Sequence, residues 1–294
     1  MDEIDLNLIK TLVANSRIPY RDLASVSNMS VSAIHKRINK LIEDGVISTF
    51  VARPSIIALK YLWIVIFGTS KARSLTEMSK EIGYHENVER IAIMGGKFVY
   101  IVGFLRDISE LQDFSNYVSN TAQIIEPTVG ILNVQYVTTP ESLTTIDYKI
   151  LKTLNRDARK PITDIAEDVG ISAKTVRKRL DRMMEYKLAT FSTQWAPVYK
   201  DCFITLFDIN LNEGTDIQST IHYLNEKYSQ NLVDCASYSN IPNMIIMETW
   251  TTNAQESQMI LEKLQSEGFK DIIPHIRLSG EYFDCWIDQL LRTK

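Results

Sequence analysis

The chain repeats part of its own sequence, and this repeat constrains its fold more than any other feature. IDLNLIKTL, starting at Ile4, aligns with IDYKILKTL, starting at Ile146, and the register holds without a gap for about forty residues. Identities along the register include Arg17 with Arg159, Pro19 with Pro161, Asp22 with Asp164, Ser30 with Ser172, and Glu43 with Glu185. So many matches at one offset indicate that a structural unit is duplicated.

Each copy of the repeat predicts three helices. In the third helix, expected over about Val31–Asp44, apolar residues recur at helical spacing, and Ser30 is placed to cap the first turn through its hydroxyl. Ser172 has the same place in the second copy. The apolar positions expected to face inward are Ile34, Ile38, Leu41 and Ile42 in the first copy, and Val176, Leu180, Met183 and Met184 in the second. A short β-hairpin wing is expected after each third helix, over Val46–Arg53 and Leu188–Trp195.

The rest of the chain also reads as two divergent copies. From Tyr61 to Val137, and again from Cys202 to Leu278, strands and helices are expected in the order β-α-β-β-α-β. This order is typical of the ferredoxin-like pattern, an antiparallel sheet covered on one face by two helices. A C-terminal helix is expected over about Tyr282–Leu291, and prolines mark boundaries near Pro54, Pro140 and Pro197.

Composition excludes several classes of protein. Hydrophobic residues make up 45% and charged residues 23%, which is ordinary globular usage. The longest apolar run, Tyr61–Phe67, is too short to span a bilayer. Three widely spaced cysteines favour neither a disulfide framework nor a zinc site, and the four histidines show no metal-ligand spacing. We therefore expect a reduced, cytoplasmic protein without metal or cofactor, and the absence of catalytic motifs predicts that it is not an enzyme.

Charge is unevenly distributed along the chain. The total is −4, but residues 1–55 carry +1 and residues 144–200 carry +5, which leaves −10 for the remainder. A local basic patch, rather than the total charge, decides whether a protein meets phosphate. The two repeated segments are therefore candidates for nucleic-acid binding.

The order of these elements resembles the Lrp/AsnC family of transcriptional regulators. The residues that carry the resemblance are IDLNLIKTL, RIPYRDLA and MSVSAIHKRINKLIEDGVI, then IDYKILKTL, RKPITDIA and ISAKTVRKRLDRMMEYKLA. The resemblance implies an α+β fold with two winged helix-turn-helix domains alternating with two ferredoxin-like (RAM-type) domains. The expected boundaries are 1–54, 55–140, 141–197 and 198–281, with the C-terminal helix at 282–294. Because family members pair through the ferredoxin-like modules, one chain is expected to form a pseudo-dimer.

The resemblance also implies a set of site residues. Double-stranded DNA is the expected partner, read in the major groove by the third helix of each copy. The residues expected to face it are Ser32, Ala33, Lys36, Arg37, Asn39, Lys40, Lys174, Thr175, Arg177, Lys178, Arg179 and Arg182, with His35 at the edge. Amino-acid sensors of the family carry a Gly-x-Tyr-Asp-like turn. At this place the chain has Gly95, Gly96, Lys97 and Phe98, without the acidic residue. A small-molecule effector bound at this turn is therefore a secondary prediction. Lys187 replaces the glycine that ends the third helix of the first copy, Gly45.

Two other functions fit the same scaffold. One is a decarboxylase acting on tetrapyrroles, since relatives of the family include such enzymes; it would need acid–base groups converging in the ferredoxin-like modules, and the sequence shows no evident cluster. The other is a ligand sensor or assembly protein without DNA binding. A homo-dimer or a higher oligomer is a further expected assembly.

Overall fold

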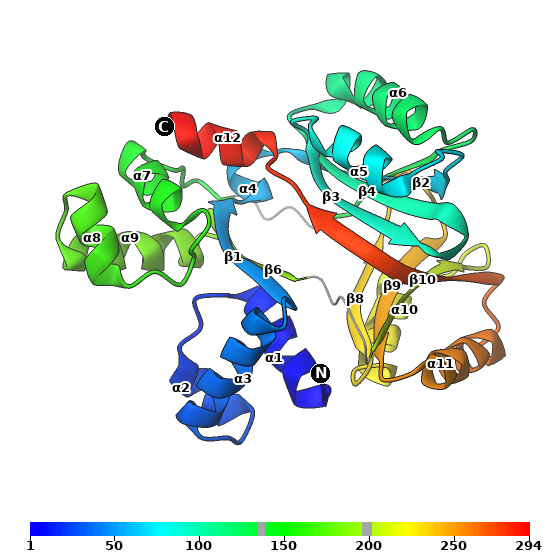
Figure 1. Cartoon of the computed structure of the whole chain (residues 1–294), viewed down its shortest axis with the longest axis horizontal. Coiled ribbons are helices and arrows are strands. Elements are labelled where there is room, and N and C mark those ends of the chain that lie inside the picture. Colours follow the sequence, from blue (N-terminus) through cyan, green and yellow to red (C-terminus); the bar gives the residue numbers. More distant parts are fainter. Residues whose placement is uncertain (135–138, 196–201) are drawn as a thin grey trace. The chain divides into compact units, whose positions relative to one another are not determined.

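The computed structural model describes residues 1–134, 139–195 and 202–294, and within them the chain forms two compact units. The helix-turn-helix unit comprises Asn7–Tyr61, Gln135–Ala196 and Asp284–Lys294. The sheet unit comprises Met1–Leu6, Leu62–Val134 and Pro197–Phe283. The two copies of each module are thus gathered into one unit, rather than alternating in space as they do in sequence (Figure 1). The expected boundary at Pro197 lies outside the described residues.

Each copy of the repeat forms the three expected helices. The first copy contains α1 (Glu3–Ala14), α2 (Tyr20–Val26), α3 (Val31–Glu43), β1 (Ile47–Pro54) and the short α4 (Ile56–Leu59). The second contains α7 (Thr145–Leu154), α8 (Ile162–Val169), α9 (Ala173–Glu185) and β6 (Ala189–Trp195). The inward positions are buried as expected, except that Ile42 is 43% and Met184 37% exposed. The helical face that packs is therefore narrower than the apolar pattern predicts.

The two wings do not fold into separate hairpins. Each copy contributes one strand, and β1 pairs antiparallel with β6 to form a two-stranded sheet between the copies. Two equivalent arginines reinforce this contact reciprocally: Arg17 donates to the carbonyl of Lys160 at 3.3 Å, and Arg159 donates to that of the equivalent Ile18 at 3.1 Å. Such mutual contacts are the mark of a two-fold interface. The duplicated helix-turn-helix domains are therefore held to each other within one chain.

The C-terminal helix completes the helix-turn-helix unit. α12 (Trp286–Thr293) begins later than expected because the preceding strand continues to Tyr282. It places Leu291 in the core of the second copy. Asp288 is fully buried and accepts from Nε and Nη2 of Arg53 on β1 at 2.8 and 2.7 Å. The last residues of the chain therefore stabilise a domain that begins far away in sequence.

The sheet unit contains both ferredoxin-like modules. The first has β2 (Leu62–Thr69), α5 (Leu75–Gly83), β3 (Val88–Met94), a 3₁₀ turn (Gly95–Lys97), β4 (Phe98–Leu105), a second 3₁₀ turn (Ile108–Glu110), α6 (Leu111–Ala122) and β5 (Thr128–Ile131). The second has β7 (Phe203–Asn210), α10 (Ile217–Lys227), β8 (Leu232–Ser237), β9 (Met244–Thr251), α11 (Ala254–Ser266) and β10 (Asp271–Tyr282). Gln135–Val137, at the expected end of the first module, lie outside the described residues.

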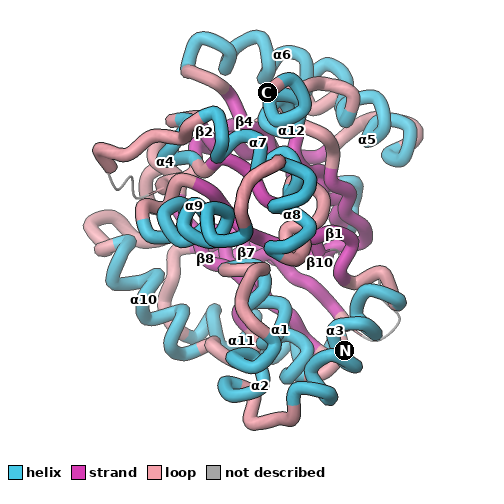
Figure 2. The backbone as a smooth tube through the Cα atoms, turned by 90° about the vertical axis from the view of Figure 1, so that its left-hand side faces the viewer, coloured by secondary structure: helices cyan, strands magenta, loops and turns pink. Residues whose placement is uncertain are grey.

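The two modules share one sheet of eight strands in the order β5-β2-β4-β3-β10-β7-β9-β8. The long β10 joins them, since it pairs with β7 of its own module and with β3 of the other. The ends of the order also meet, through a bridge between Leu132 and Tyr238 and a hydrogen bond from Ser239 N to Ile131 O at 2.8 Å. Helices α5 and α6 lie on one side and α10 and α11 on the other, with the strands between (Figure 2). One face of the sheet is therefore covered by helices, and the other is enclosed.

We expect Lys187→Gly to raise the free energy of unfolding by about 0.5–1 kcal/mol. Lys187 lies two residues after the end of α9 and has φ +51°, in the left-handed region that disfavours a residue with a Cβ. Gly45 has φ +72° at the matching place in the first copy, and no atom lies within 4 Å of where its Cβ would stand. The reverse exchange, Gly45→Lys, should therefore destabilise by a similar amount. Thermal unfolding of both variants tests this prediction. Melting temperatures that change in the same direction in the two variants would contradict it.

Candidate nucleic-acid interface

In the first copy, α3 presents a polar face away from its core. Ser30 caps the helix by accepting from the backbone N–H of Ala33 at 3.2 Å, which orients the first turn. Ile34 and Ile38 are fully buried, so the opposite side is left to solvent. The exposed predicted residues are Ser32, Lys36, Asn39 and Lys40, and the half-buried ones are Ala33 and Arg37. His35 is exposed and stacks on Tyr20 of α2 at 3.6 Å between ring centroids.

In the second copy, α9 is capped in the same way by Ser172, which accepts from Thr175 N at 3.1 Å. Val176 and Met183 are fully buried and fix the orientation of the helix. The exposed predicted residues are Lys174, Arg177 and Lys178, and the half-buried ones are Thr175, Arg179 and Arg182. Each third helix thus shows solvent a cationic face that begins at a capped N-terminus.

Two of the predicted arginines on α9 contact acidic groups of their own domain. Arg182 donates to Glu141 Oε2 at 2.7 Å and to Asp147 Oδ2 at 3.0 Å. Arg179 Nη1 lies 3.7 Å from Asp147 Oδ1 and donates to Thr144 at 3.3 Å. Asp147 is fully buried, so these contacts compensate a charge removed from water. The exposed cations of α9 are Lys174, Arg177 and Lys178. None of the three forms an ion pair within the described residues.

We expect Arg182→Ala to lower the free energy of unfolding by about 1–3 kcal/mol, because the buried Asp147 carboxylate would lose the nearer of its two arginine partners. Lys178→Ala, on the exposed side of the same helix, should change it by no more than about 0.5 kcal/mol. Urea denaturation of the two variants measures the difference. Equal stability of the two would contradict a structural role for Arg182.

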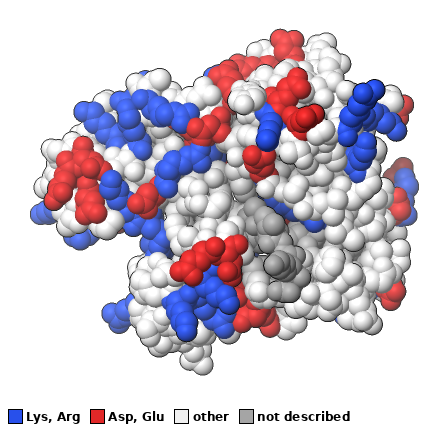
Figure 3. Space-filling model, viewed as in Figure 1, with Lys and Arg blue, Asp and Glu red and all other residues white. Residues whose placement is uncertain are grey.

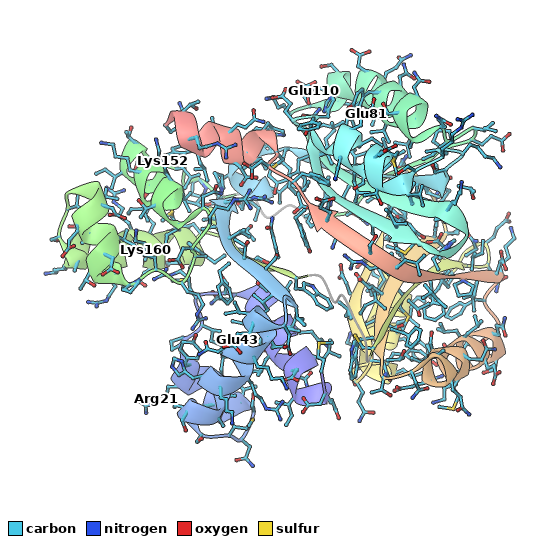
Figure 4. All side chains as sticks on the ribbon, viewed as in Figure 1. Arg21, Glu43, Glu81, Glu110, Lys152 and Lys160 are labelled. Atoms are coloured by element: carbon cyan, nitrogen blue, oxygen red, sulfur yellow. The ribbon has the colours of Figure 1, made fainter. Side chains whose placement is uncertain are left out.

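The visible surface of the helix-turn-helix unit has mixed charge. Lys and Arg gather over the bundles of both copies, with patches of Asp and Glu beside them (Figure 3). Arg21 on α2 and Glu43 at the end of α3 belong to the first bundle, while Lys152 and Lys160 belong to the second (Figure 4). Lys160 pairs with Asp168. On α9 itself, five Lys and Arg residues stand against two acids, Asp181 and Glu185.

The turn predicted for an effector lies at the end of β3. Gly96 and Lys97 have φ of +69° and +61°, and Lys97 Nζ donates to the carbonyl of Ala72 at 3.0 Å. Gly95, Gly96 and Lys97 are exposed. Phe98 instead points toward the second module, where it stacks on His275 at 4.0 Å between centroids. The predicted effector residues therefore do not form one site: the glycines face solvent, whereas Phe98 packs against His275.

An acid–base cluster that the sequence analysis missed lies between the two modules. Tyr100 on β4 donates to Asp208 Oδ1 on β7 at 2.9 Å, and His275 Nε2 on β10 lies 3.2 Å from Asp208 Oδ2. Burial, together with the neighbouring Asp208, raises the pKa of the Tyr100 hydroxyl. Asp208 lies 108 positions after Tyr100, and His275 follows later still, so only strand pairing reveals the cluster. The one local signal is Asp208, a charged residue within the largely apolar sequence of β7.

Other chemical sites are not evident in the described ranges. No group of three or more His, Cys, Asp or Glu residues is arranged to hold a metal ion among residues 1–134, 139–195 and 202–294. In the same ranges, no helix has the length and apolar character needed to cross a membrane.

Comparison with known proteins identifies both copies of the repeat. A winged helix-turn-helix DNA-binding model matches residues 1–48, and an AsnC-type helix-turn-helix model matches residues 143–184. An uncharacterised HTH-type transcriptional regulator of Pyrococcus furiosus is 31% identical over 129 residues, covering 43% of this chain and 87% of the relative. One from Pyrococcus horikoshii is 32% identical over 127 residues, covering 43% and 85%. Each relative thus corresponds to about half of this chain.

The whole chain matches a different kind of protein in fold. The crystal structure of the siroheme decarboxylase NirDL superposes with a TM-score of 0.61 at 14% identity, covering 99% of this chain and 98% of that one. At this identity the likeness concerns the fold alone. It nevertheless corrects the prediction that the chain is not an enzyme: that prediction rested on missing motifs, whereas a fold of this full length is found in an enzyme.

Proposed function

The chain belongs to the Lrp/AsnC family of helix-turn-helix transcriptional regulators, and from this premise we propose that it is a sequence-specific regulator that binds duplex DNA through α3 and α9. The observation that carries the proposal is the joining of two capped, cation-bearing helices in one compact unit by β1, β6 and the reciprocal arginines. A pair of such helices would supply the two recognition helices that a helix-turn-helix dimer places in the major groove. In this proposal one chain carries both recognition helices.

The two recognition helices differ in the residues at their N-terminal ends, so the operator should be an imperfect palindrome. α3 begins with Ser32 and Ala33, where α9 has Lys174 and Thr175. Lysine donates to guanine, whereas the methyl groups of alanine and threonine contact thymine. Half-sites centred about 34 Å apart, or a multiple of that distance, would let both helices enter the major groove on one side of the duplex.

Selection of bound duplexes from a random pool with the full chain tests the proposal. The expected result is an enriched site with two related, unequal halves, and an affinity that falls steeply with salt because bound cations displace counterions. Failure to enrich any sequence, together with an affinity unchanged between 50 and 200 mM salt, would refute DNA binding.

A second candidate is an enzyme on the same scaffold, supported by the convergence of Tyr100, Asp208 and His275. A siroheme decarboxylase is similar in fold over the full length of the chain, so a tetrapyrrole is the first substrate to try. Visible absorbance of the purified chain, and mass spectrometry of siroheme incubated with it, provide the test. A loss of carboxyl groups that disappears in His275→Gln would support this candidate, and unchanged siroheme would exclude it for that substrate.

A further inference from the structure

The ring of Tyr20, the first residue of α2, contacts residues from both copies of the repeat. Within its own copy it stacks on the His35 imidazole of α3, with ring centroids 3.6 Å apart and planes 22° from parallel. From the other copy, the Arg159 guanidinium lies over the same ring, with its Cζ 4.3 Å from the centroid. Ring stacking and a guanidinium placed over a ring are both attractive contacts. Tyr20 therefore links α3 to the second copy.

Arg159 is held at the interface between the copies. Its Nη1 donates to the backbone carbonyls of Ser16 and Ile18, the second at 3.1 Å. Both carbonyls belong to the connection between α1 and α2, immediately before Tyr20. The guanidinium Cζ also lies 5.6 Å from the centroid of the Phe50 ring on β1. Because these contacts restrain the side chain, its guanidinium gives the Tyr20 ring a fixed surface to pack on.

The second copy carries no aromatic ring at the matching positions. Ile162 corresponds to Tyr20, and Arg177 corresponds to His35. Ile162 packs against the core of its own copy, and Arg177 is exposed. The interface arginine of the first copy, Arg17, still donates to backbone carbonyls across the contact. The carbonyl contacts are thus found on both sides of the interface, whereas the aromatic link belongs to the first copy.

The stack lies on the flank of α3, beside the face expected to meet DNA. Ile34 and Ile38 are fully buried and hold one side of the helix in the core. His35 follows Ile34 directly, so it projects about 100° around the helix axis from that side. A rotation of α3 that changed which residues face the groove would separate the rings of His35 and Tyr20. The stack therefore opposes that rotation.

We propose that Arg159, Tyr20 and His35 are positioning residues, through which the second copy fixes the orientation of α3. The consequence for binding rests on the proposed function, because α3 is then a recognition helix held ready for the major groove. A helix already held in its bound orientation loses less freedom when it binds. His35 acts in this way through its ring and does not read a base. Reading of the first half-site therefore depends on the second copy.

Hydrogen exchange of the free full-length chain tests the link without DNA. Tyr20→Ile introduces the side chain type that the second copy has at this position, whereas Tyr20→Phe keeps the ring. Amide exchange in α3 should become at least about fivefold faster in Tyr20→Ile and stay unchanged in Tyr20→Phe, with α9 unaffected by either. Exchange in α3 that is the same in the wild type and in Tyr20→Ile would overturn the inference.

The contribution of the second copy is tested with a matched pair of arginine variants. Arg159→Met and Arg17→Met each remove an arginine that donates to carbonyls across the interface. Only Arg159 lies over the Tyr20 ring, so Arg159→Met should speed exchange in α3 more than Arg17→Met does. Equal effects of the two variants on α3 would show that the interface as a whole, and not the stack, holds the helix.

Fluorescence anisotropy with a selected duplex tests what the stack does for binding. Tyr20→Ile should weaken affinity for the full site about tenfold and leave the slope against salt unchanged, because no cation is lost. Affinity for a duplex that holds the second half-site alone should not change. His35→Gln removes the ring and should match Tyr20→Ile in the full site, whereas His35→Phe keeps the ring, lacks the ring nitrogens and should bind like the wild type.

Two binding results would overturn the inference: full affinity in Tyr20→Ile, or a loss in His35→Phe as large as in His35→Gln, which would show that the imidazole contacts DNA itself. Circular dichroism reports whether each variant folds, and His35→Gln, at an exposed position, serves if Tyr20→Ile does not fold. A wild-type chain that binds no duplex, with exchange in α3 responding as expected, would refute the proposed function and still support positioning of α3 by the second copy.

Discussion

Replacing Asp288 with alanine should lower the free energy of unfolding of the helix-turn-helix unit by about 3–5 kcal/mol, because Arg53 would remain buried without its counter-charge. Asp288 also accepts from Asn155 Nδ2 at 2.8 Å and from the backbone N–H of Cys285 at 3.1 Å. The variant therefore removes the contact that joins α12 to both copies. Urea unfolding with hydrogen exchange, which separates the two units, measures the loss.

Asp284→Ala is the matched control. Asp284 precedes the same helix and pairs with Arg292 at 2.5 Å, but its side chain is 42% exposed, so its removal should cost no more than about 1 kcal/mol. Equal losses in the two variants would show that burial does not decide the effect.

The Asp288 contact also predicts an acid dependence. Burial opposes the charged carboxylate, but Arg53 outweighs it and holds the pKa of Asp288 below its usual range. The pair therefore stabilises the fold above the ordinary Asp pKa of about 3.9, and its contribution is lost as the pH falls through the lower pKa of the folded state.

Replacing Lys174, Arg177 and Lys178 together with alanine should abolish most of the electrostatic DNA affinity of the second copy. If each cation neutralises one phosphate, the slope of log affinity against log salt should become less steep by about 2.7. Lys36→Ala with Lys40→Ala in the first copy should reduce the slope by about 1.8, since only two cations are removed. Fluorescence anisotropy on one selected duplex, over a series of salt concentrations, gives both slopes.

The contrasting variant is Arg179→Ala with Arg182→Ala. These arginines contact Asp147 and Glu141, so their loss should reduce stability with a smaller change in salt slope. A slope change as large as that of the triple variant would show that these arginines leave Asp147 to contact DNA.

Local sequence predicted the helices of both repeat copies and the caps of α3 and α9, because the responsible interactions lie within a few residues. Ser30 and Ser172 cap their helices as expected, since a capping hydroxyl needs only the N–H three positions on. The repeat predicted two copies of one domain. The exposure of Ile42 and Met184 was not predictable from periodicity, because the width of the buried face depends on what packs against it.

Strand partners and the buried cluster were decided only by tertiary structure. The sequence of a strand does not specify which other strand it pairs with. The pairing of β1 with β6, and of β10 with β3, therefore does not follow from the alternation of apolar and polar residues. The pairing of β10 with β3 and with β7 brings together Tyr100, Asp208 and His275, and it buries the side chain of Arg277. The helix-turn-helix copies and their cationic faces follow from local sequence. Which polar residues of the sheet lie together depends on strand pairing between distant segments, which local sequence does not specify.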